Sequence, residues 1–346
     1  MATENGKEAR TKSTDTSGTP LLRVNDLKTY FFTREGTVKA VDGVSLEVQR
    51  GEIRGIVGES GCGKSMTAMS ILRLVDKPGK IVSGDVYFHG ENLLKKSRRE
   101  MARIRGRKIS VIFQEPRSSL NPVLRVGKQL TEVLRIHEGI NSKQGQARAV
   151  DLLKEVGIPD PQKRSTNYPH EMSGGMAQRV MIAMGMACAP DLLIADEPTT
   201  ALDVTIQAQV LDLIRNLRDE HGMGVMLITH DMGVVAEMAD IVTVMYAGTS
   251  VEEAPTEELF EEPLHPYTQG LIASIPVMGK VKDRLDVIPG RVPDLIDMPV
   301  GCRFAPRCKA RIENQLTKCE VEEPDMLDAR PGHRVRCWLY ESENAS

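Results

Sequence analysis

Apolar and polar positions along the chain alternate between strand-like and helix-like periods. Residues 52–57, with Ile53, Ile56 and Val57, are interpreted as a short buried strand, and residues 66–74 carry an apolar face at helical spacing. From about residue 99 to 185 helical periodicity replaces the β-branched strand pattern, whereas residues 190–253 return to apolar strands that alternate with helices. This order predicts an α/β fold with a parallel sheet and a helical subdomain at about 99–185.

Length and composition indicate a globular protein with more than one structural unit. At 346 residues the chain exceeds a single usual core, so we expect one large domain with an appendage. The longest uninterrupted apolar run, residues 180–189, is about half of the roughly 20 residues that span a bilayer, so no transmembrane segment is predicted. Residues 1–20 are polar and are expected to be a disordered leader. A formal net charge of −3 argues against nucleic acid as the main partner.

A glycine-rich motif, Gly-x4-Gly-Lys-Ser, lies between the buried strand at 52–57 and the helix that follows it. Such a loop points backbone N–H groups at phosphates, while Lys64 reaches the β and γ oxygens and Ser65 can ligate Mg²⁺. The alternative is a flexible glycine-rich turn, but the flanking strand and helix favour a phosphate-binding loop. We expect nucleotide contacts from Gly58, Ser60, Gly61, Cys62, Gly63, Lys64, Ser65 and Met66.

A second anion site is predicted at Ser173-Gly174-Gly175. Ser173 is a good N-cap for the helical run at 176–187, and the two glycines leave that helix N-terminus open to an anion. Taken alone, an ordinary serine-capped helix start would be the better interpretation. Because the phosphate loop already serves its own chain, the second site makes sense if it faces the γ-phosphate that a partner holds.

Polar residues follow three further apolar runs. Asp196 and Glu197 end one run, while Gln114 and His230 each end another. Taken singly, such residues are more often solvated caps or ordinary surface and core residues. As a pair, Asp196 is suited to hold Mg²⁺ through its hydration shell and Glu197 to polarise an attacking water.

In their order along the chain, these motifs resemble those of ABC ATPases. The resemblance implies a P-loop ATPase with a RecA-like core, an antiparallel β subdomain and a helical subdomain, spanning residues 21–255. It implies that Gln114 ligates Mg²⁺ and water, that Asp203 lies in a D-loop at a dimer interface, and that His230 contacts the γ-phosphate. Because no internal repeat is present, the chain supplies one cassette and needs a second to sandwich two MgATP.

Adenine is expected to stack on an aromatic ring. Tyr30, Phe31 and Phe32 lie upstream of the phosphate loop, where ABC ATPases keep such an aromatic residue. We favour Phe31, with Tyr30 next. A role as core residues of an edge strand stays open, because three adjacent aromatics leave the register undetermined.

Residues 256–346 resemble the small regulatory C-terminal extension of ABC ATPases that power dipeptide and oligopeptide import. Residues 66–72 further resemble the D-type ATPase of such importers. This implies a heterodimer with an F-type ATPase, two integral permeases and an extracytoplasmic peptide-binding protein, with this chain peripheral on the cytoplasmic face. The match runs through residues 259–276, 288–290, 301–308 and 332–337.

Two alternatives to peptide import remain open. Relatives of the peptide importers carry nickel or oligosaccharides, and the binding protein and permeases select the cargo, so nothing in an ATPase sequence identifies it. A soluble ABC ATPase that works without a permease is disfavoured, because the chain has one cassette and no heptad run.

Cysteines are concentrated in the extension. Disulfides are unlikely in a cytosolic protein, and the paired Cys-x2-Cys hairpins of zinc sites are absent, so metal binding or coincidence remains. Family resemblance implies a [4Fe-4S] cluster, although the Cys308–Cys319 spacing is longer than the family commonly has, and zinc or no metal stays open. We expect such a cluster to be structural and changes at its cysteines to leave nucleotide binding nearly intact. The candidate ligands are Cys302, Cys308, Cys319 and Cys337.

Overall fold

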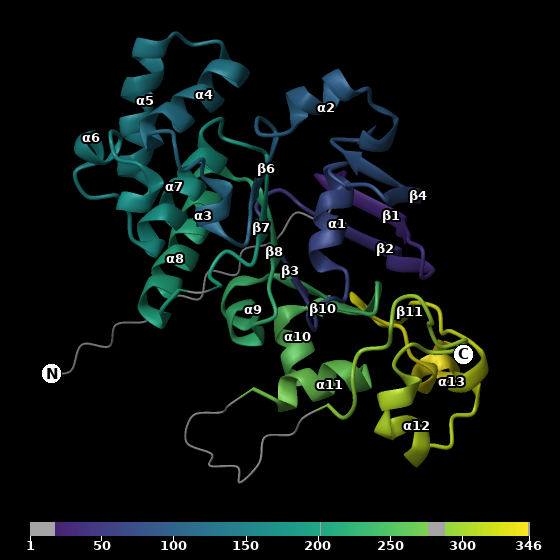
Figure 1. The fold of residues 1–346 in the computed structure, drawn as a ribbon. Helices are drawn as coiled ribbons and strands as arrows, with labels where there is room; N and C mark the ends of the chain where they lie inside the picture. Colours follow the sequence, from purple (N-terminus) through teal and green to yellow (C-terminus); the bar gives the residue numbers. More distant parts are fainter. Residues whose placement is uncertain (1–17, 201, 276–287, 345–346) are drawn as a thin grey trace, which may run out of the picture.

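The computed structural model describes residues 18–200, 202–275 and 288–344, so residues 1–17 of the predicted leader lie outside the described part. The described chain forms two sheets with helices around them. The helices from the middle of the chain lie on one side, and the C-terminal extension lies on the other (Figure 1).

The larger sheet has eight strands in the order β11-β12-β10-β9-β3-β8-β7-β6. The strands from β9 to β6 are parallel, as the alternating apolar runs and helices predicted. β3, β7 and β8 are buried along their whole length, which explains their mainly apolar sequences; the buried Arg54 of β3 pairs with Glu52 and Glu253. The bounds are β3 (Ile53–Val57), β6 (Ile109–Ile112), β7 (Leu192–Asp196), β8 (Gly224–Ile228), β9 (Ile241–Tyr246), β10 (Thr249–Pro255), β11 (Leu327–Arg330) and β12 (His333–Val335).

The smaller sheet is antiparallel, in the order β2-β1-β4-β5. Its apolar side chains, among them Leu22 and Leu46, share a core with helix α1 (Lys64–Ile71). Thr29 Oγ1 also lies 2.7 Å from Ser70 Oγ of that helix, a buried hydrogen bond. The sheet therefore fixes the helix that follows the phosphate loop. Its strands are β1 (Leu22–Phe32), β2 (Thr37–Val48), β4 (Gly79–Phe88) and β5 (Glu91–Asn92).

Helices α4 to α7 form a group within the range predicted to be helical (Figure 1). Leu130, Leu152 and Val180 pack in one core that continues into the strands through Leu193 and Val225. None of the helices in the described ranges combines the length and apolar character that a membrane crossing requires. The bounds are α2 (Arg98–Ile104), α3 (Pro116–Ser119), α4 (Val126–Glu138), α5 (Ser142–Glu155), α6 (Pro161–Arg164), α7 (Gly174–Met186), α8 (Val204–His221) and α9 (Met232–Met238).

The chain beyond β10 packs back onto the larger sheet. β12 pairs with β10, so the extension continues the core sheet, a pairing that the sequence did not predict. The buried rings of Tyr246, Tyr267 and Phe304 pack together, with centroids 4.7 to 5.5 Å apart. The extension contains α10 (Thr256–Glu261), α11 (Pro266–Ala273), the 3-10 helix η3 (Ala305–Arg307), α12 (Lys309–Glu313) and α13 (Lys318–Val321).

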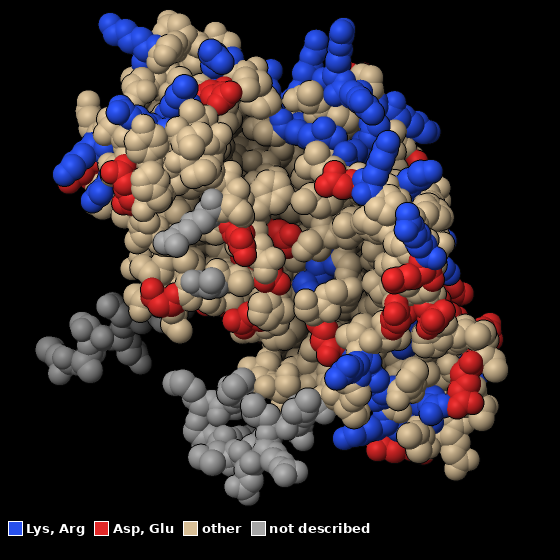
Figure 2. Space-filling model, viewed as in Figure 1, with Lys and Arg blue, Asp and Glu red and all other residues tan. Residues whose placement is uncertain are grey.

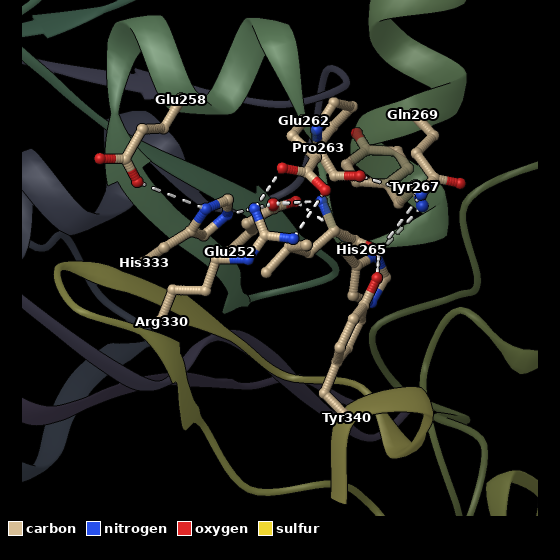
Figure 3. A network of polar contacts seen from close by, with 11 residues as sticks. Glu252, Glu258, Glu262, Pro263, His265, Tyr267, Gln269, Arg330, His333 and Tyr340 are labelled. Carbon is tan, nitrogen blue, oxygen red and sulfur yellow. Dashed lines mark hydrogen bonds and ion pairs between the residues drawn. The ribbon is translucent and has the colours of Figure 1, made fainter. Parts of the chain in front are cut away.

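A buried polar network fastens the extension to β10 (Figure 3). Glu252 on β10 accepts the backbone N–H groups of Leu264 at 2.7 Å and His265 at 3.0 Å. Its Oε1 also lies 2.7 Å from Nε2 of the buried His333 on β12. Because a buried carboxylate needs several partners to offset its lost hydration, these contacts fix both segments relative to β10.

Candidate nucleotide-binding and hydrolysis site

The predicted phosphate loop turns from β3 into α1, and two of its glycines are required for that turn. Gly58 has φ 150° and Gly63 has φ 102°, conformations that favour glycine. A Cβ on Gly58 would lie 2.2 Å from Met245 O, and a Cβ on Gly63 would lie 2.3 Å from Ala40 O. The loop therefore approaches neighbouring backbone too closely for any side chain at these positions.

Lys64 lies folded over the loop and is almost fully buried. Its Nζ donates to Gly58 O at 2.7 Å and to Glu59 O at 3.0 Å, positions from which it can move onto phosphate oxygens. Ser65 Oγ donates to Asp196 Oδ1 at 3.0 Å. This pair joins the loop hydroxyl to the strand-end carboxylate, the two groups that hold Mg²⁺ in P-loop ATPases. Burial raises the pKa of Asp196.

The other residues predicted to contact nucleotide differ in their surroundings. Ser60 and Gly61 are exposed at the mouth of the loop. Cys62 is buried beneath it, and burial raises the pKa of its thiol. Met66 is half-buried and packs against the core of the smaller sheet. Ser60 and Gly61 are thus accessible to a ligand, whereas the side chains of Cys62 and Met66 fill space.

Glu197 is the centre of a polar cluster just beyond β7. Its Oε2 accepts hydrogen bonds from Gln114 Nε2 and Thr200 Oγ1, each at 2.8 Å, and its Oε1 lies 3.0 Å from His230 Nδ1. Its φ of 48° is strained for a residue other than glycine, as is common at functional sites. Burial alone would raise its pKa, but hydrogen bonds from His230 and Thr200 outweigh burial and lower it. Glu197 is therefore ionised at neutral pH and can accept a proton.

The signature segment, residues 173–175, begins α7. Ser173 Oγ accepts a backbone N–H of the first helical turn at 3.3 Å, so the predicted N-cap is present. Gly175 lies against α8, where a Cβ would be 2.8 Å from Ile206. Asp203 caps α8 by accepting the Ile206 N–H at 3.0 Å, while Ala201 of the predicted D-loop lies outside the described residues. α7 and α1 lie on opposite sides of β6 and β7 in Figure 1.

The adjacent aromatic residues have different neighbours. Tyr30 Oη donates to Asp42 at 2.6 Å, and Lys39 Nζ lies 6.0 Å from the centre of the Tyr30 ring. Phe31 faces β4, where a Cβ on Gly79 would lie 2.7 Å from its ring. Tyr30 is thus held by polar groups of the neighbouring strand β2, whereas Phe31 packs against β4.

The four cysteines predicted to bind a cluster do come together in the extension. The backbone N–H of Cys302 donates to Cys319 O at 2.9 Å, and the pKa of Cys337, raised chiefly by burial, also responds to charge on the other three thiols. However, no three His, Cys, Asp or Glu side chains of the described residues are arranged to bind a metal. The predicted iron–sulfur cluster is therefore not supported by this conformation. Burial raises the pKa of all four thiols and favours neutral packing groups.

Three residues at the site were not predicted from the sequence: Thr200, Tyr267 and Arg307. Thr200 has a weak local signal, since a hydroxyl three positions after Glu197 can turn back to its carboxylate. Arg307 and Tyr267 contact Glu59 from the extension, at separations of 248 and 208 positions along the chain. No local pattern identifies contacts at such separations.

Comparison with known proteins agrees with this geometry. Residues 41–200 match the ABC transporter family, and residues 251–314 match the oligopeptide/dipeptide transporter C-terminal region. The chain is 50% identical over 326 residues to the oligopeptide transport ATP-binding protein AppD of Bacillus subtilis, covering 94% of this chain and 98% of that protein. It is 52% identical over 320 residues to a probable peptide ABC transporter ATP-binding protein of Sinorhizobium fredii, covering 92% and 94% of the two chains.

Solved structures confirm the cassette fold. A dimeric ATP-binding cassette in a post-hydrolysis state, bound to ADP and phosphate, matches with a TM-score of 0.61 at 27% identity. The match covers 68% of this chain and 98% of that one. With a P-loop, a Ser65–Asp196 pair suited to Mg²⁺ and an ionised Glu197 in place, the fold is that of an ATPase. The chain belongs to the family of ATP-binding subunits of oligopeptide and dipeptide ABC transporters.

Proposed function

We propose that this chain hydrolyses ATP to drive peptide import through two integral permeases, which receive their cargo from an extracytoplasmic peptide-binding protein. The family of the extension and the names of the relatives support peptide as the cargo. The main support for ATP hydrolysis is the cluster around Glu197. Its carboxylate contacts the side chains of Gln114, Thr200 and His230, and it lies next to the Asp196–Ser65 pair.

The hydrolytic roles follow from the polar contacts. Glu197 would accept a proton from the attacking water, and Gln114 and His230, which contact the Glu197 carboxylate, would orient that water. Gln114 would also contact the Mg²⁺ shell and His230 the γ-phosphate. Ser65 and Asp196 would hold Mg²⁺, which neutralises phosphate charge when bound. All five side chains come from this chain, so it provides one complete set of hydrolytic groups.

Nucleotide binding is assigned to the loop and one aromatic ring. Lys64 leaves the carbonyls of Gly58 and Glu59 to contact the β- and γ-phosphates. Tyr30 is the better candidate for stacking on adenine, because Phe31 packs against β4. An aromatic stack of this kind contributes roughly 1 kcal/mol or more.

We assign the signature segment of this chain to contacts with the nucleotide that a second, F-type cassette holds. A capped helix N-terminus with two glycines favours an anion, and α7 lies apart from α1 in the same chain (Figure 1). In a head-to-tail pair, Ser173, Gly174 and Gly175 of each subunit would face the γ-phosphate held by the other. Asp203, which caps the neighbouring helix α8, would lie at the same interface.

The permeases are expected to dock beside Gln114. A groove of about 220 Å³ lies between the core and the helical group, and its lining includes Phe113, Leu120, Val133, His137 and Met181. Figure 2 shows Lys and Arg gathered over α2, beside this groove, where Lys95, Arg98, Arg99, Arg103 and Arg107 are exposed. A basic rim suits anionic lipid headgroups, which supports a peripheral position on the cytoplasmic face of the membrane.

The four thiols are a soft donor set, and we assign them a [4Fe-4S] cluster that pins the extension. The support is the chemistry of four soft donors in one extension, since the described side chains are not arranged around a metal in this conformation. Protein purified without oxygen should then be brown and contain iron and sulfide. Zinc without sulfide would indicate a structural zinc site, and colourless, metal-free protein that supports uptake would reduce the cysteines to packing residues.

The ATPase assignment is tested by Glu197→Gln in the assembled transporter. The substitution keeps the shape of the side chain but removes the base, so hydrolysis should fall about 100-fold or more while ATP binding survives and closed dimers accumulate. Glu220→Gln, at an exposed position near the end of α8, is the matched control and should leave turnover unchanged. Near-normal turnover of the Glu197 variant would refute the assignment.

A further inference from the structure

The C-terminal extension holds one residue of the phosphate loop by both its side chain and its backbone. Arg307 in η3 pairs with the Glu59 carboxylate through Nη1 and Oε2 at 2.7 Å and through Nη2 and Oε1 at 3.0 Å. Tyr267 on α11 accepts the backbone N–H of Glu59 at 2.8 Å. Glu59 follows Gly58 directly, so both contacts act on the loop that turns toward the phosphates.

The Arg307 side chain is itself fixed before it reaches the loop. It is 4% exposed, and its Nε donates to Pro289 O at 2.8 Å. Its Nη1 also lies 3.3 Å from Tyr246 Oη, and the guanidinium carbon lies 5.7 Å from the centre of the Tyr246 ring. A two-pronged, mostly buried Arg–carboxylate pair of this kind is strong and directional. The partners of Arg307 other than Glu59 therefore fix its guanidinium, which restricts the position of the Glu59 carboxylate.

Arg303, four residues before Arg307, contacts Asp42 on β2, the strand that also contacts Tyr30. Arg303 Nη2 donates to Asp42 Oδ2 at 2.7 Å, and Oδ1 of that carboxylate accepts the Tyr30 hydroxyl at 2.6 Å. Arg303 Nη1 donates to Ala247 O at 2.8 Å. The short segment 302–308 thus contacts the P-loop directly and, through Asp42, is linked to the aromatic residue assigned to adenine.

These contacts bear on nucleotide binding through Lys64. The Lys64 ammonium donates to the carbonyls of Gly58 and Glu59. The orientation of these two peptide groups therefore determines where the ammonium lies before phosphate binds. The Glu59 carboxylate also brings negative charge to the loop, and Arg307 neutralises it. Without Arg307, that charge would repel a polyanionic ligand and the loop would lose a fixed point.

We propose that Arg307 and Tyr267 are positioning residues of the nucleotide site, which hold the P-loop in the form that accepts phosphates. The extension is then part of the ATP-binding machinery and raises its affinity for nucleotide. This inference rests on the proposed function only in requiring that the site binds ATP. It also bears on the expectation that changes at the four cysteines leave nucleotide binding nearly intact, because Arg307 directly precedes Cys308.

Equilibrium binding of a fluorescent ATP analogue with Mg²⁺ to the full-length chain tests the proposal, with thermal unfolding of each variant measured in parallel. Arg307→Gln should weaken binding about 10-fold or more, and Tyr267→Phe, which keeps the ring packing, about 3-fold. Adding Glu59→Gln to Arg307→Gln should restore most of the affinity, because it removes the unpaired charge. Arg311→Gln is the matched control, since Arg311 pairs with Glu320 inside the extension, and it should change affinity by less than about twofold.

Wild-type affinity in both Arg307→Gln and Tyr267→Phe would overturn the proposal. Equally weak binding by the single Arg307 variant and the double variant would also overturn it, because a purely structural role is not rescued by removing a charge. If Arg307→Gln does not fold, Tyr267→Phe decides the question, and unchanged affinity in that variant refutes the proposal. A wild-type chain that binds no analogue would instead overturn the proposed ATPase function, and this inference with it.

Discussion

The buried His265 gives the extension a specific dependence on acid. His265 is 2% exposed and caps α11, where its Nδ1 accepts the backbone N–H of Tyr267 at 3.0 Å. Burial is the main cause that lowers its pKa from 6.5 to about 4; the nearby Glu252 carboxylate (Figure 3) opposes burial, and the Arg336 charge acts in the same direction as burial. At neutral pH the ring is therefore neutral in the folded and the unfolded chain.

The sign of the pH effect follows from the lowered pKa. Below pH 6.5 the unfolded chain binds a proton at this ring and the folded chain does not, so acid favours unfolding until the pH reaches about 4. Each pH unit in that window removes about 1.4 kcal/mol. The folded state should therefore lose about 2 kcal/mol from this group alone between pH 6.5 and pH 5.

His265→Asn isolates this contribution. Asparagine can keep the N-cap but does not titrate, so the variant should start with lower stability and then lose less as the pH falls. The free energy of unfolding in urea, measured from pH 7.5 to pH 5, should show the two curves converging by about 2 kcal/mol. Parallel curves, or an imidazole that titrates near 6.5 in the folded protein by NMR, would refute the reasoning.

Three further predictions concern the loop and the buried network. Lys64→Ala should weaken MgATP binding about 10-fold or more in a fluorescence titration, and an unchanged dissociation constant would contradict its assigned role. Gly63→Ala places a Cβ 2.3 Å from Ala40 O at φ 102°, so urea unfolding should show a loss of roughly 1–3 kcal/mol; unchanged stability would count against the strain argument. Glu252→Ala leaves three donors without their acceptor, so limited proteolysis should cut the extension first, and uniform digestion would argue otherwise.

The sequence predicted the helices, strands and caps that follow from short-range residue patterns. The strand and helix around the phosphate loop follow from an apolar run, a glycine motif and a helical period, and they appear as β3 and α1. The Ser173 cap has the same local origin. The meeting of Gln114, Glu197 and His230 was implied only by resemblance, because three strand ends come together through the order of a parallel sheet.

Features set by register or by distant contacts could not be predicted in the same way. Tyr30 and Phe31 are adjacent, and a shift of one position exchanges their faces, so the pattern alone could not assign the adenine contact. The pairing of β12 with β10 involves a strand of only three residues, His333–Val335, too short to give a periodic signal. Its position depends instead on Glu252, whose partners come together only in the folded chain.

The cysteine-rich segment lies far from the phosphate loop along the chain, yet the two are in contact and depend on each other structurally. From the sequence, changes at the four cysteines of this tail are expected to leave nucleotide binding nearly intact, and no local pattern in the tail indicates contact with the ATP site. Yet Arg307 is 4% exposed because its charge is satisfied by Glu59 of the P-loop, and Arg303 is 8% exposed because it reaches Asp42. In an isolated tail Arg303 would keep the carboxylate of Glu323, 2.9 Å from its Nε, but Arg307 would lose Glu59, and a buried charge without a partner is strongly disfavoured. The burial of Arg307 therefore requires the cassette, and the geometry of the phosphate loop depends in turn on the tail.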